Sequence, residues 1–261
     1  MDKYHPDKKW LEGAIQSYIE YLKIENEYSL GNTSQILGSG AVKESESLLC
    51  QLYGCQYARL IPSASYGLRV CMQVSGVGID DEVIIPEVDW IASEAAIVSL
   101  GAKPIYAPVN AKNIVNVNEI EELISTKTKS IVATHYNAIP VDVLKIKRVL
   151  GRINRPDVKI IEDCSQSFMV KYRNKLCGTT GDFAVFSFGP NKQIDIGECG
   201  MIICKEKDVY NQVIRYTGHP ANLLLNGMGD DTPADALSIR PNPLSAVLLV
   251  TELRRIITDY Q

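Results

Sequence analysis

The sequence has little of what marks a membrane protein, a disordered chain or a nucleic-acid-binding chain. No apolar run reaches the roughly 18 residues that a membrane helix needs. The 27 basic and 31 acidic residues give a formal net charge of −4, so no general attraction draws the chain to nucleic acid or to anionic membranes. Its 46% apolar and 22% charged residues are typical of a globular protein. We expect a folded cytoplasmic protein without membrane or nucleic-acid partners.

The cysteines lack the spacing of a disulfide framework. There are seven, an odd number, and they lie scattered in otherwise apolar segments, which favours a reducing compartment. Two pairs are five residues apart, Cys50 with Cys55 and Cys199 with Cys204. With no CxxC motif and only three histidines, the sequence predicts no metal site.

Several common catalytic motifs are also missing. The pair Gly38 and Gly40 has Lys43 where a dinucleotide fingerprint needs its third glycine. The chain has no GxxxxGK[ST] loop and no G-x-S-x-G elbow. These absences exclude the usual dinucleotide-binding, P-loop and serine-hydrolase motifs.

Strand-like and helical patterns alternate along the middle of the chain. Such alternation, with nearly continuous apolar strands, is typical of a parallel sheet covered on both faces. The strand-like runs cover residues 57–61, 82–85, 103–107, 130–134 and 159–162, and the helical patterns between them cover 68–74, 90–100, 117–124 and 141–150.

The two ends of the chain complete this pattern. We predict an α/β fold with three layers, in which helices cover both faces of a mostly parallel sheet. The prediction is one domain over residues 1–261, with an N-terminal helical segment at 1–40 and the α/β core and final helix at 41–261. The remaining elements are helices at 8–25, 42–53, 206–216 and 244–260 and two strands, 182–188 and 200–204, joined by a polar loop.

Residues that follow strands are candidates for a site, because ligands of open α/β sheets lie beyond the carboxyl ends of the strands. The first group is the Pro62–Gly67 segment, whose small residues before a helix form either a phosphate cradle or a plain helix cap. The second is Asp89 with Trp90, where the indole either stacks on a cofactor or packs in a core or interface.

Two further groups bring charge to strand ends. Asp163 ends a buried apolar run, so its carboxylate needs a cation or several donors, although it could simply cap a helix. Lys192 lies in a turn after a strand, where a lysine is usually a solvated charge. Together the four groups supply an anion cradle, an aromatic plate, a carboxylate for a protonated ring nitrogen and an amine for a Schiff base. Pyridoxal 5′-phosphate requires this set.

At this point the chain resembles the DegT/DnrJ-type sugar aminotransferases, which are pyridoxal-phosphate enzymes of fold type I. The resemblance runs from about Gly40 to the C-terminus. It is carried by IIEDCSQSF, GDFAVFSFGPNKQ and GECGM, and further by DDEVIIP, DW at Asp89 and Trp90, LGAKPIY and HYNAIPVD.

The resemblance implies roles for individual residues. Lys192 would link to the cofactor aldehyde and move a proton between the substrate and the cofactor, while Asp163 would keep the pyridinium nitrogen protonated. Trp90 would stack on the ring, and Gln166 would lie near its other face or its phenolic oxygen. The phosphate would be held by Ala64, Ser65 and Tyr66, with a further hydroxyl from Ser187.

The chain departs from the family pattern in three places. Ser238 replaces an asparagine that in the family reaches the partner subunit's phosphate. Cys199 replaces a glycine, and either packs in the interior or offers a reactive thiol. The family continues for roughly a further hundred residues into a small C-terminal domain, which we expect this chain to lack.

The predicted function is transfer of an amino group from an amino acid, glutamate being the expected donor, to a small-molecule keto acceptor in sugar or secondary-metabolite biosynthesis. Two alternatives stay open. The chain could be a cofactor-binding subunit that needs a complementary partner, or an enzyme of another pyridoxal-phosphate reaction, since the same residues serve several reactions. The expected assembly is a homodimer or a heteromer with a chain that supplies the missing domain.

Overall fold

A computed structural model describes residues 8–24, 27–28, 40–219, 223–224, 227–229, 232–237 and 239–259. Within these residues no helix is both long enough and apolar enough to cross a membrane. The chain divides into two compact units, and we describe each by itself. The first contains Met1–Ser63, Phe188–Met201 and Lys205–Gln261, and the second contains Ala64–Ser187 and Ile202–Cys204.

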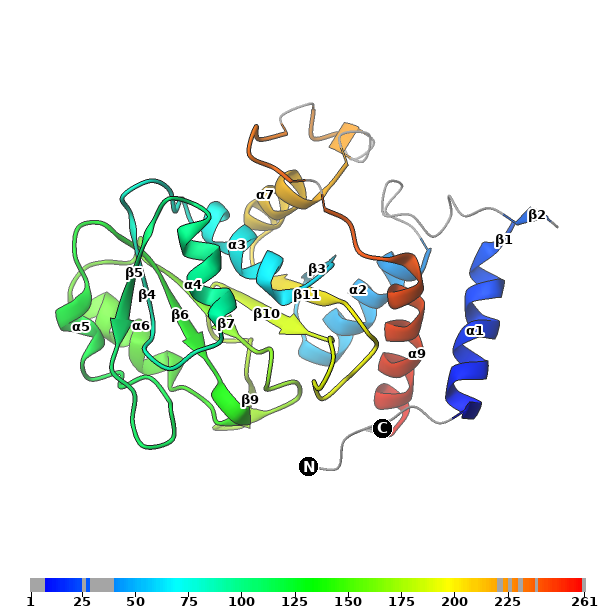
Figure 1. The fold of residues 1–261 in the computed structure, drawn as a ribbon, viewed down its shortest axis with the longest axis horizontal. Coiled ribbons are helices and arrows are strands. Elements are labelled where there is room, and N and C mark those ends of the chain that lie inside the picture. The colour runs from blue at the N-terminus through cyan, green and yellow to red at the C-terminus, as the bar shows by residue number, and fades with distance from the viewer. Residues whose placement is uncertain are drawn as a thin grey trace. The chain divides into compact units, whose positions relative to one another are not determined.

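The first unit is mainly helical. The helix α2 packs against α9 and against strand β3, α1 packs against α9, and α7 packs against β3 (Figure 1). Their apolar positions recur at helical spacing, which gives each helix one face to bury. The elements are α1 (Lys8–Leu22), β1 (Lys23–Ile24), β2 (Glu27–Tyr28), α2 (Gly40–Tyr53), β3 (Tyr57–Ile61), α7 (Lys207–Thr217) and α9 (Pro243–Asp259).

The second unit contains most of a seven-stranded sheet with the order β3-β11-β10-β7-β6-β4-β5. The pairs β10 with β7, β7 with β6, β6 with β4 and β4 with β5 are all parallel. The strands are β4 (Glu82–Pro86), β5 (Lys103–Ala107), β6 (Thr128–Thr134), β7 (Lys159–Asp163), β10 (Phe183–Ser187) and β11 (Gly200–Cys204), of which β11 belongs to both units.

Helices cover the sheet of the second unit on both faces. On one face, Ile84, Ile131 and Ile160 from the centres of three strands join a buried cluster with residues of α5 and α6. On the other, α3 contacts β7 and β10, and α4 contacts β4 and β5 (Figure 1). The helical elements are α3 (Ala64–Val74), α4 (Ile91–Val98), α5 (Ile120–Leu123), η3 (Tyr136–Ala138) and α6 (Val143–Arg152), and a small hairpin joins β8 (Lys171–Tyr172) to β9 (Lys175–Leu176).

The predicted α/β fold with a mostly parallel sheet is confirmed, with differences at element ends. The helix α3 begins at Ala64 rather than 68, so the expected phosphate-binding residues form its first turn. The helix predicted over 117–124 is only one turn, because the side chain of Asn116 accepts from the backbone N–H of Asn118 and holds a turn there. The β8–β9 hairpin was not predicted.

Candidate active site

The carboxyl ends of parallel strands in the second unit bring four polar residues to one edge of the sheet. Ser187 and Asp163 are the last residues of β10 and β7, and Thr134 is the last residue of β6. Asp89 follows β4 by three residues. Because β10, β7, β6 and β4 run parallel in this order, these residues lie at the same edge, where ligands of such sheets bind.

Strand alternation decides which face each side chain takes. Asp163 is directly opposite Thr134 on β6 and Val185 on β10, so these three side chains point to one face. The preceding residue, Glu162, points to the opposite face, which is the one that Ile160 shares with α5 and α6. The sheet therefore separates two neighbouring carboxylates into two different environments.

Asp163 is held firmly at the end of its strand. It is 6% exposed, and its Oδ1 accepts a hydrogen bond of 2.8 Å from the backbone N–H of Ser165. Its backbone carbonyl accepts from the N–H of His135 at 3.0 Å. A buried carboxylate of this kind is stable only with donors or a cation beside it, which suits a partner for a protonated ring nitrogen.

Asp89 lies on the same side of the sheet and is bound by three donors. Its Oδ2 accepts from the hydroxyls of Ser93 at 2.8 Å and Thr134 at 2.9 Å, and its Oδ1 accepts from the N–H of Trp90 at 2.8 Å. Burial and then the negative charge of Asp163 raise the pKa of Asp89 to about 6, against the opposing effect of these donors. Asp89 is thus a carboxyl that titrates near neutral pH beside Asp163.

Trp90 precedes α4 and is not a core residue. Its side chain is 68% exposed, and it takes an extended backbone conformation as the N-cap residue of the helix. Of the two interpretations of a tryptophan at a strand end, packing in the protein core is therefore wrong. An exposed indole at this edge is available for stacking.

The expected phosphate-binding residues open helix α3. Ala64 and Tyr66 are buried, whereas Ser65 is exposed. The first N–H groups of a helix have no partner within the helix, and together with the helix dipole they favour an anion. The 11 residues of α3 are enough to provide this dipole.

Gln166 and Ser187 complete the candidate set of the second unit. The Gln166 side chain oxygen accepts from the N–H of Asn137 at 2.8 Å, which ties the segment after β7 to the segment after β6. Ser187 is half-buried and ends β10 on the face of Asp163.

Lys192 belongs to the first unit, in the loop between β10 and β11. It is half-buried, and its backbone N–H donates to the carbonyl of Gly189 at 3.2 Å. The loop is held by Asp195, whose carboxylate accepts from the N–H groups of Asn191 at 3.1 Å and Gly197 at 3.3 Å. The structure fixes the local shape of the loop that carries this amine, while its role in binding a cofactor stays a prediction.

The two substituted positions of the family pattern, Cys199 and Ser238, have different outcomes. Cys199 is buried, which supports the packed interpretation, and burial raises the pKa of its thiol to about 12, which disfavours the thiolate that a reactive cysteine needs. Ser238 lies outside the described residues.

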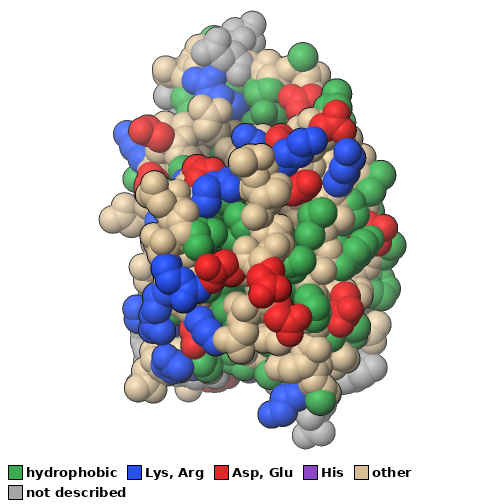
Figure 2. Space-filling model, turned by 90° about the vertical axis from the view of Figure 1, so that its left-hand side faces the viewer, with side chains coloured by type: hydrophobic (Ala, Val, Ile, Leu, Met, Phe, Trp, Pro, Cys, Tyr) green, Lys and Arg blue, Asp and Glu red, His purple; other side chains and the backbone are tan. Residues whose placement is uncertain are grey.

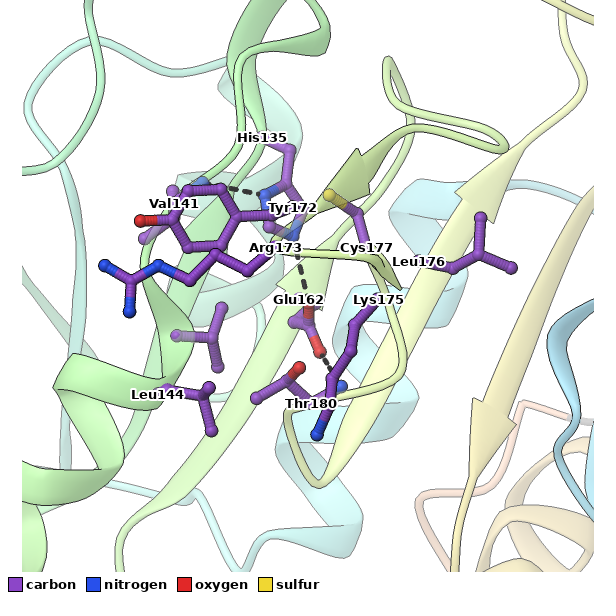
Figure 3. Close-up of a pocket in the computed structure, with 11 residues that line it drawn as sticks. His135, Val141, Leu144, Glu162, Tyr172, Arg173, Lys175, Leu176, Cys177 and Thr180 are labelled. Atoms are coloured by element: carbon purple, nitrogen blue, oxygen red, sulfur yellow. Dashed lines mark hydrogen bonds and ion pairs between the residues drawn. The ribbon is translucent and has the colours of Figure 1, made fainter.

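A second polar site lies on the opposite face of the sheet (Figure 3). Glu162 and His135 are each 1% exposed, and the imidazole Nε2 lies 3.0 Å from Glu162 Oε2. The carboxylate also accepts from the backbone N–H groups of Gly178 and Thr180, at 2.8 and 2.7 Å, and from that of Gly181. Burial alone would raise the pKa of Glu162, but the bonds from His135 and the backbone lower it.

The hydrogen bonds of His135 decide whether this cluster suits a metal ion. His135, Glu162 and Cys164 offer ligand atoms within 4.8 Å of one another. However, the N–H of Val141 donates to Nδ1 of His135 at 3.0 Å, so the ring proton must lie on Nε2 and point to Glu162. Neither ring nitrogen then has a free lone pair for a metal. The hydrogen bonds of Glu162 instead hold β7 to the loop before β10.

Sequence reasoning gave no function to Asp89, Thr134, Glu162 or His135. The position of Asp89 just after a strand places it in the second candidate group, but there only the indole of Trp90 is given a role. The pairing of Glu162 with His135 had no such signal, because they are 27 residues apart and the side of the sheet depends on the register between β6 and β7.

The surface at the β5 side of the second unit carries no field of one sign. Figure 2 shows basic and acidic side chains both present on this face, with hydrophobic ones between them.

The sequence and the fold of this chain are similar to those of known proteins. A curated protein, GDP-perosamine synthase of Escherichia coli O157:H7, is 33% identical over 178 residues, which are 68% of this chain and 48% of that protein. The chain thus spans about half the length of this relative.

Solved structures show the same fold. An aminotransferase from Psychrobacter cryohalolentis matches with a TM-score of 0.80 and 22% identity over 99% of this chain and 64% of its own. Helicobacter pylori PseC, an aminotransferase involved in the biosynthesis of pseudoaminic acid, matches with a TM-score of 0.79 and 18% identity over 98% and 65%. Residues 25–256 match the DegT/DnrJ/EryC1/StrS aminotransferase family, and the chain belongs to this family.

Proposed function

We propose that this chain binds pyridoxal 5′-phosphate and transfers an amino group from an amino acid, with glutamate as the donor, to a keto group of a sugar or a related small molecule. The observation that carries the proposal is the buried Asp163 at the carboxyl edge of a parallel sheet, in a chain of this family. The names of the relatives, which concern perosamine and pseudoaminic acid, support a sugar acceptor.

The chemistry of the residues at this edge fits the cofactor. Asp163 would bind the ring nitrogen, and the exposed Trp90 would stack on the ring, with Gln166 beside it. The first turn of α3, with Ala64, Ser65 and Tyr66, would take the phosphate, and Ser187 would add a hydroxyl; Ser238 is kept as a further candidate. The cofactor, when bound, supplies an electron sink that acidifies the α-carbon of the amino acid.

Lys192 would link to the cofactor and then move the proton at the substrate α-carbon. A lysine amine abstracts a proton only when it is neutral, so the site must favour the uncharged amine during the reaction. The turn that Lys192 and Gly189 form, and the bonds of Asp195 to the backbone on either side of Lys192, hold the backbone of the loop that carries this amine. A base carried on a fixed backbone would contribute by orientation.

The compartment and assembly follow as proposals. All seven cysteines are free thiols, which supports a reducing cytoplasm. We propose a homodimer, or a heteromer with a complementary chain, as the working form.

The cofactor test uses absorbance and mass. Wild-type protein incubated with pyridoxal 5′-phosphate should stay yellow after the free cofactor is removed by desalting, and borohydride reduction should fix the cofactor mass on the peptide that contains Lys192. Lys192→Arg should abolish the labelled peptide, whereas Lys207→Arg, an exposed lysine at the start of α7, should not. A colourless wild-type protein, or equal labelling of many lysines, would contradict the proposal.

The half-reaction separates the enzyme from its two alternatives. Loaded protein mixed with glutamate alone should convert to the pyridoxamine form, which is followed by the loss of yellow colour and by release of 2-oxoglutarate. Conversion only after a complementary chain is added would instead indicate a dependent subunit. Consumption of an amino acid without formation of the pyridoxamine form would indicate another reaction type.

A further inference from the structure

The carboxyl of Asp89 is built into the same edge as Asp163. Asp89 reaches across from β4 to the Thr134 hydroxyl on β6, and Thr134 is the residue directly opposite Asp163 on β7. The ends of β6 and β7 and the segment after β4 thus bring Thr134, Asp163 and Asp89 together on one side of the sheet. The bond from Ser93 fixes the carboxyl from the α4 side as well.

We propose that Asp89 is a positioning residue that, by its ionisation, sets how strongly Asp163 holds a protonated ring nitrogen. This inference rests on the proposed cofactor site. With both carboxylates ionised, two negative charges favour the cationic ring, and with Asp89 protonated only Asp163 does so.

The groups that face Asp89 allow this coupling. From α4, the contacts are the Ser93 hydroxyl and the N–H of Trp90, and from β6 the Thr134 hydroxyl, all of them neutral donors. Among the described residues, Asp163 on β7 is the charged group that acts on the Asp89 carboxyl. Glu94 of α4 is engaged with Tyr106 on β5. A cation bound by Asp163 would therefore be the main new influence on Asp89.

The sign of the coupling follows from linkage. Burial and the charge of Asp163 raise the pKa of Asp89 to about 6, so at pH 6 this carboxyl is about half protonated. A ring cation held by Asp163 favours the ionised form of Asp89. Cofactor binding should therefore expel about half a proton from Asp89 at pH 6 and none at pH 8.

The test measures proton exchange rather than turnover. Pyridoxine 5′-phosphate, which has no aldehyde, is titrated into the full chain by calorimetry at pH 6 and pH 8 in buffers of different ionisation enthalpy. Wild type should release about half a proton more than Asp89→Asn at pH 6, and the two should agree at pH 8. The phosphate of the probe contributes equally to both proteins, so it cancels in the difference.

Each outcome decides one question. Binding with equal proton exchange by wild type and Asp89→Asn at pH 6 would overturn the role of Asp89 while leaving the cofactor site standing. Failure of wild type to bind the probe would overturn the cofactor site and this inference with it.

A second variant tests the path through β6. Thr134→Val removes one donor to Asp89 without changing any charge, so the window of extra proton release should move to higher pH. If the pH range of the extra proton release did not change, the role of Thr134 would be overturned.

Discussion

At the scale of single residues, Asp89 should make the stability of the protein depend on pH. Its pKa in the folded protein, about 6, lies above the value of 3.8 for a free side chain, so the folded state binds the proton more tightly. The resulting stabilisation is complete below pH 4 and is lost as the pH rises through 6. At pH 8 the buried charge therefore opposes folding.

Replacing Asp89 by asparagine removes this charge and keeps an oxygen acceptor for Ser93 and Thr134, but it turns an NH₂ group toward the N–H of Trp90, a cost that does not depend on pH. We expect the stability of Asp89→Asn relative to wild type to be about 1–3 kcal/mol higher at pH 8 than at pH 4, where wild-type Asp89 is protonated. Urea unfolding at the two pH values measures this, and a difference independent of pH would contradict the assignment.

At the scale of elements, the strands were easier to predict than the helix ends. The predicted bounds of the strands 57–61, 103–107 and 200–204 are correct, because each is a short, largely apolar run between turn residues. The start of α3 was missed because Ser65 and Gly67 are poor helix formers, while the burial of Ala64 and Tyr66 there depends on tertiary contacts.

Part of the candidate site could also be predicted from the sequence. Asp163 and Ser187 follow from strand ends alone, because parallel strands share one edge. The hairpin β8–β9 was not predictable, since two-residue strands have no periodicity. The hydrogen bonds of Glu162 to the loop before β10 were not predictable either, because their donors are backbone N–H groups.

The hydrogen bonds between Glu162 and the loop before β10 should contribute strongly to the stability of the second unit. In Glu162→Gln, an NH₂ group replaces one carboxylate oxygen and must face N–H donors, either those of Thr180 and Gly181 or those of Gly178 and His135. We expect a loss of about 3 kcal/mol in the free energy of unfolding.

The matched control is Glu122→Gln, the same change at an exposed position on α5, for which a loss below about 0.5 kcal/mol is expected. Urea unfolding of the three proteins at pH 7 is the measurement. If Glu162→Gln and Glu122→Gln lost the same free energy of unfolding, the four hydrogen bonds to Glu162 would make no net contribution to stability.

At the scale of the whole molecule, the candidate residues come from both compact units. Lys192 belongs to the first unit, whereas Asp163, Trp90 and the first turn of α3 belong to the second. A ligand that binds only the folded protein adds its binding free energy to the stability of the folded chain.

Pyridoxal 5′-phosphate should therefore stabilise the protein against urea, with a gain that rises with the logarithm of its free concentration above the dissociation constant. At a free concentration 100 times its dissociation constant, the free energy of unfolding should rise by about 2.7 kcal/mol. Lys192→Ala removes the covalent link but leaves the contacts of Asp163 and α3, so at the same ligand concentration it should gain less than wild type without losing the whole effect. Inorganic phosphate, the matched ligand control, should give only a small rise, because it engages the helix N-terminus alone. Equal gains for wild type and Lys192→Ala would show that Lys192 takes no part in binding, and equal gains with phosphate would show that the ring is not recognised.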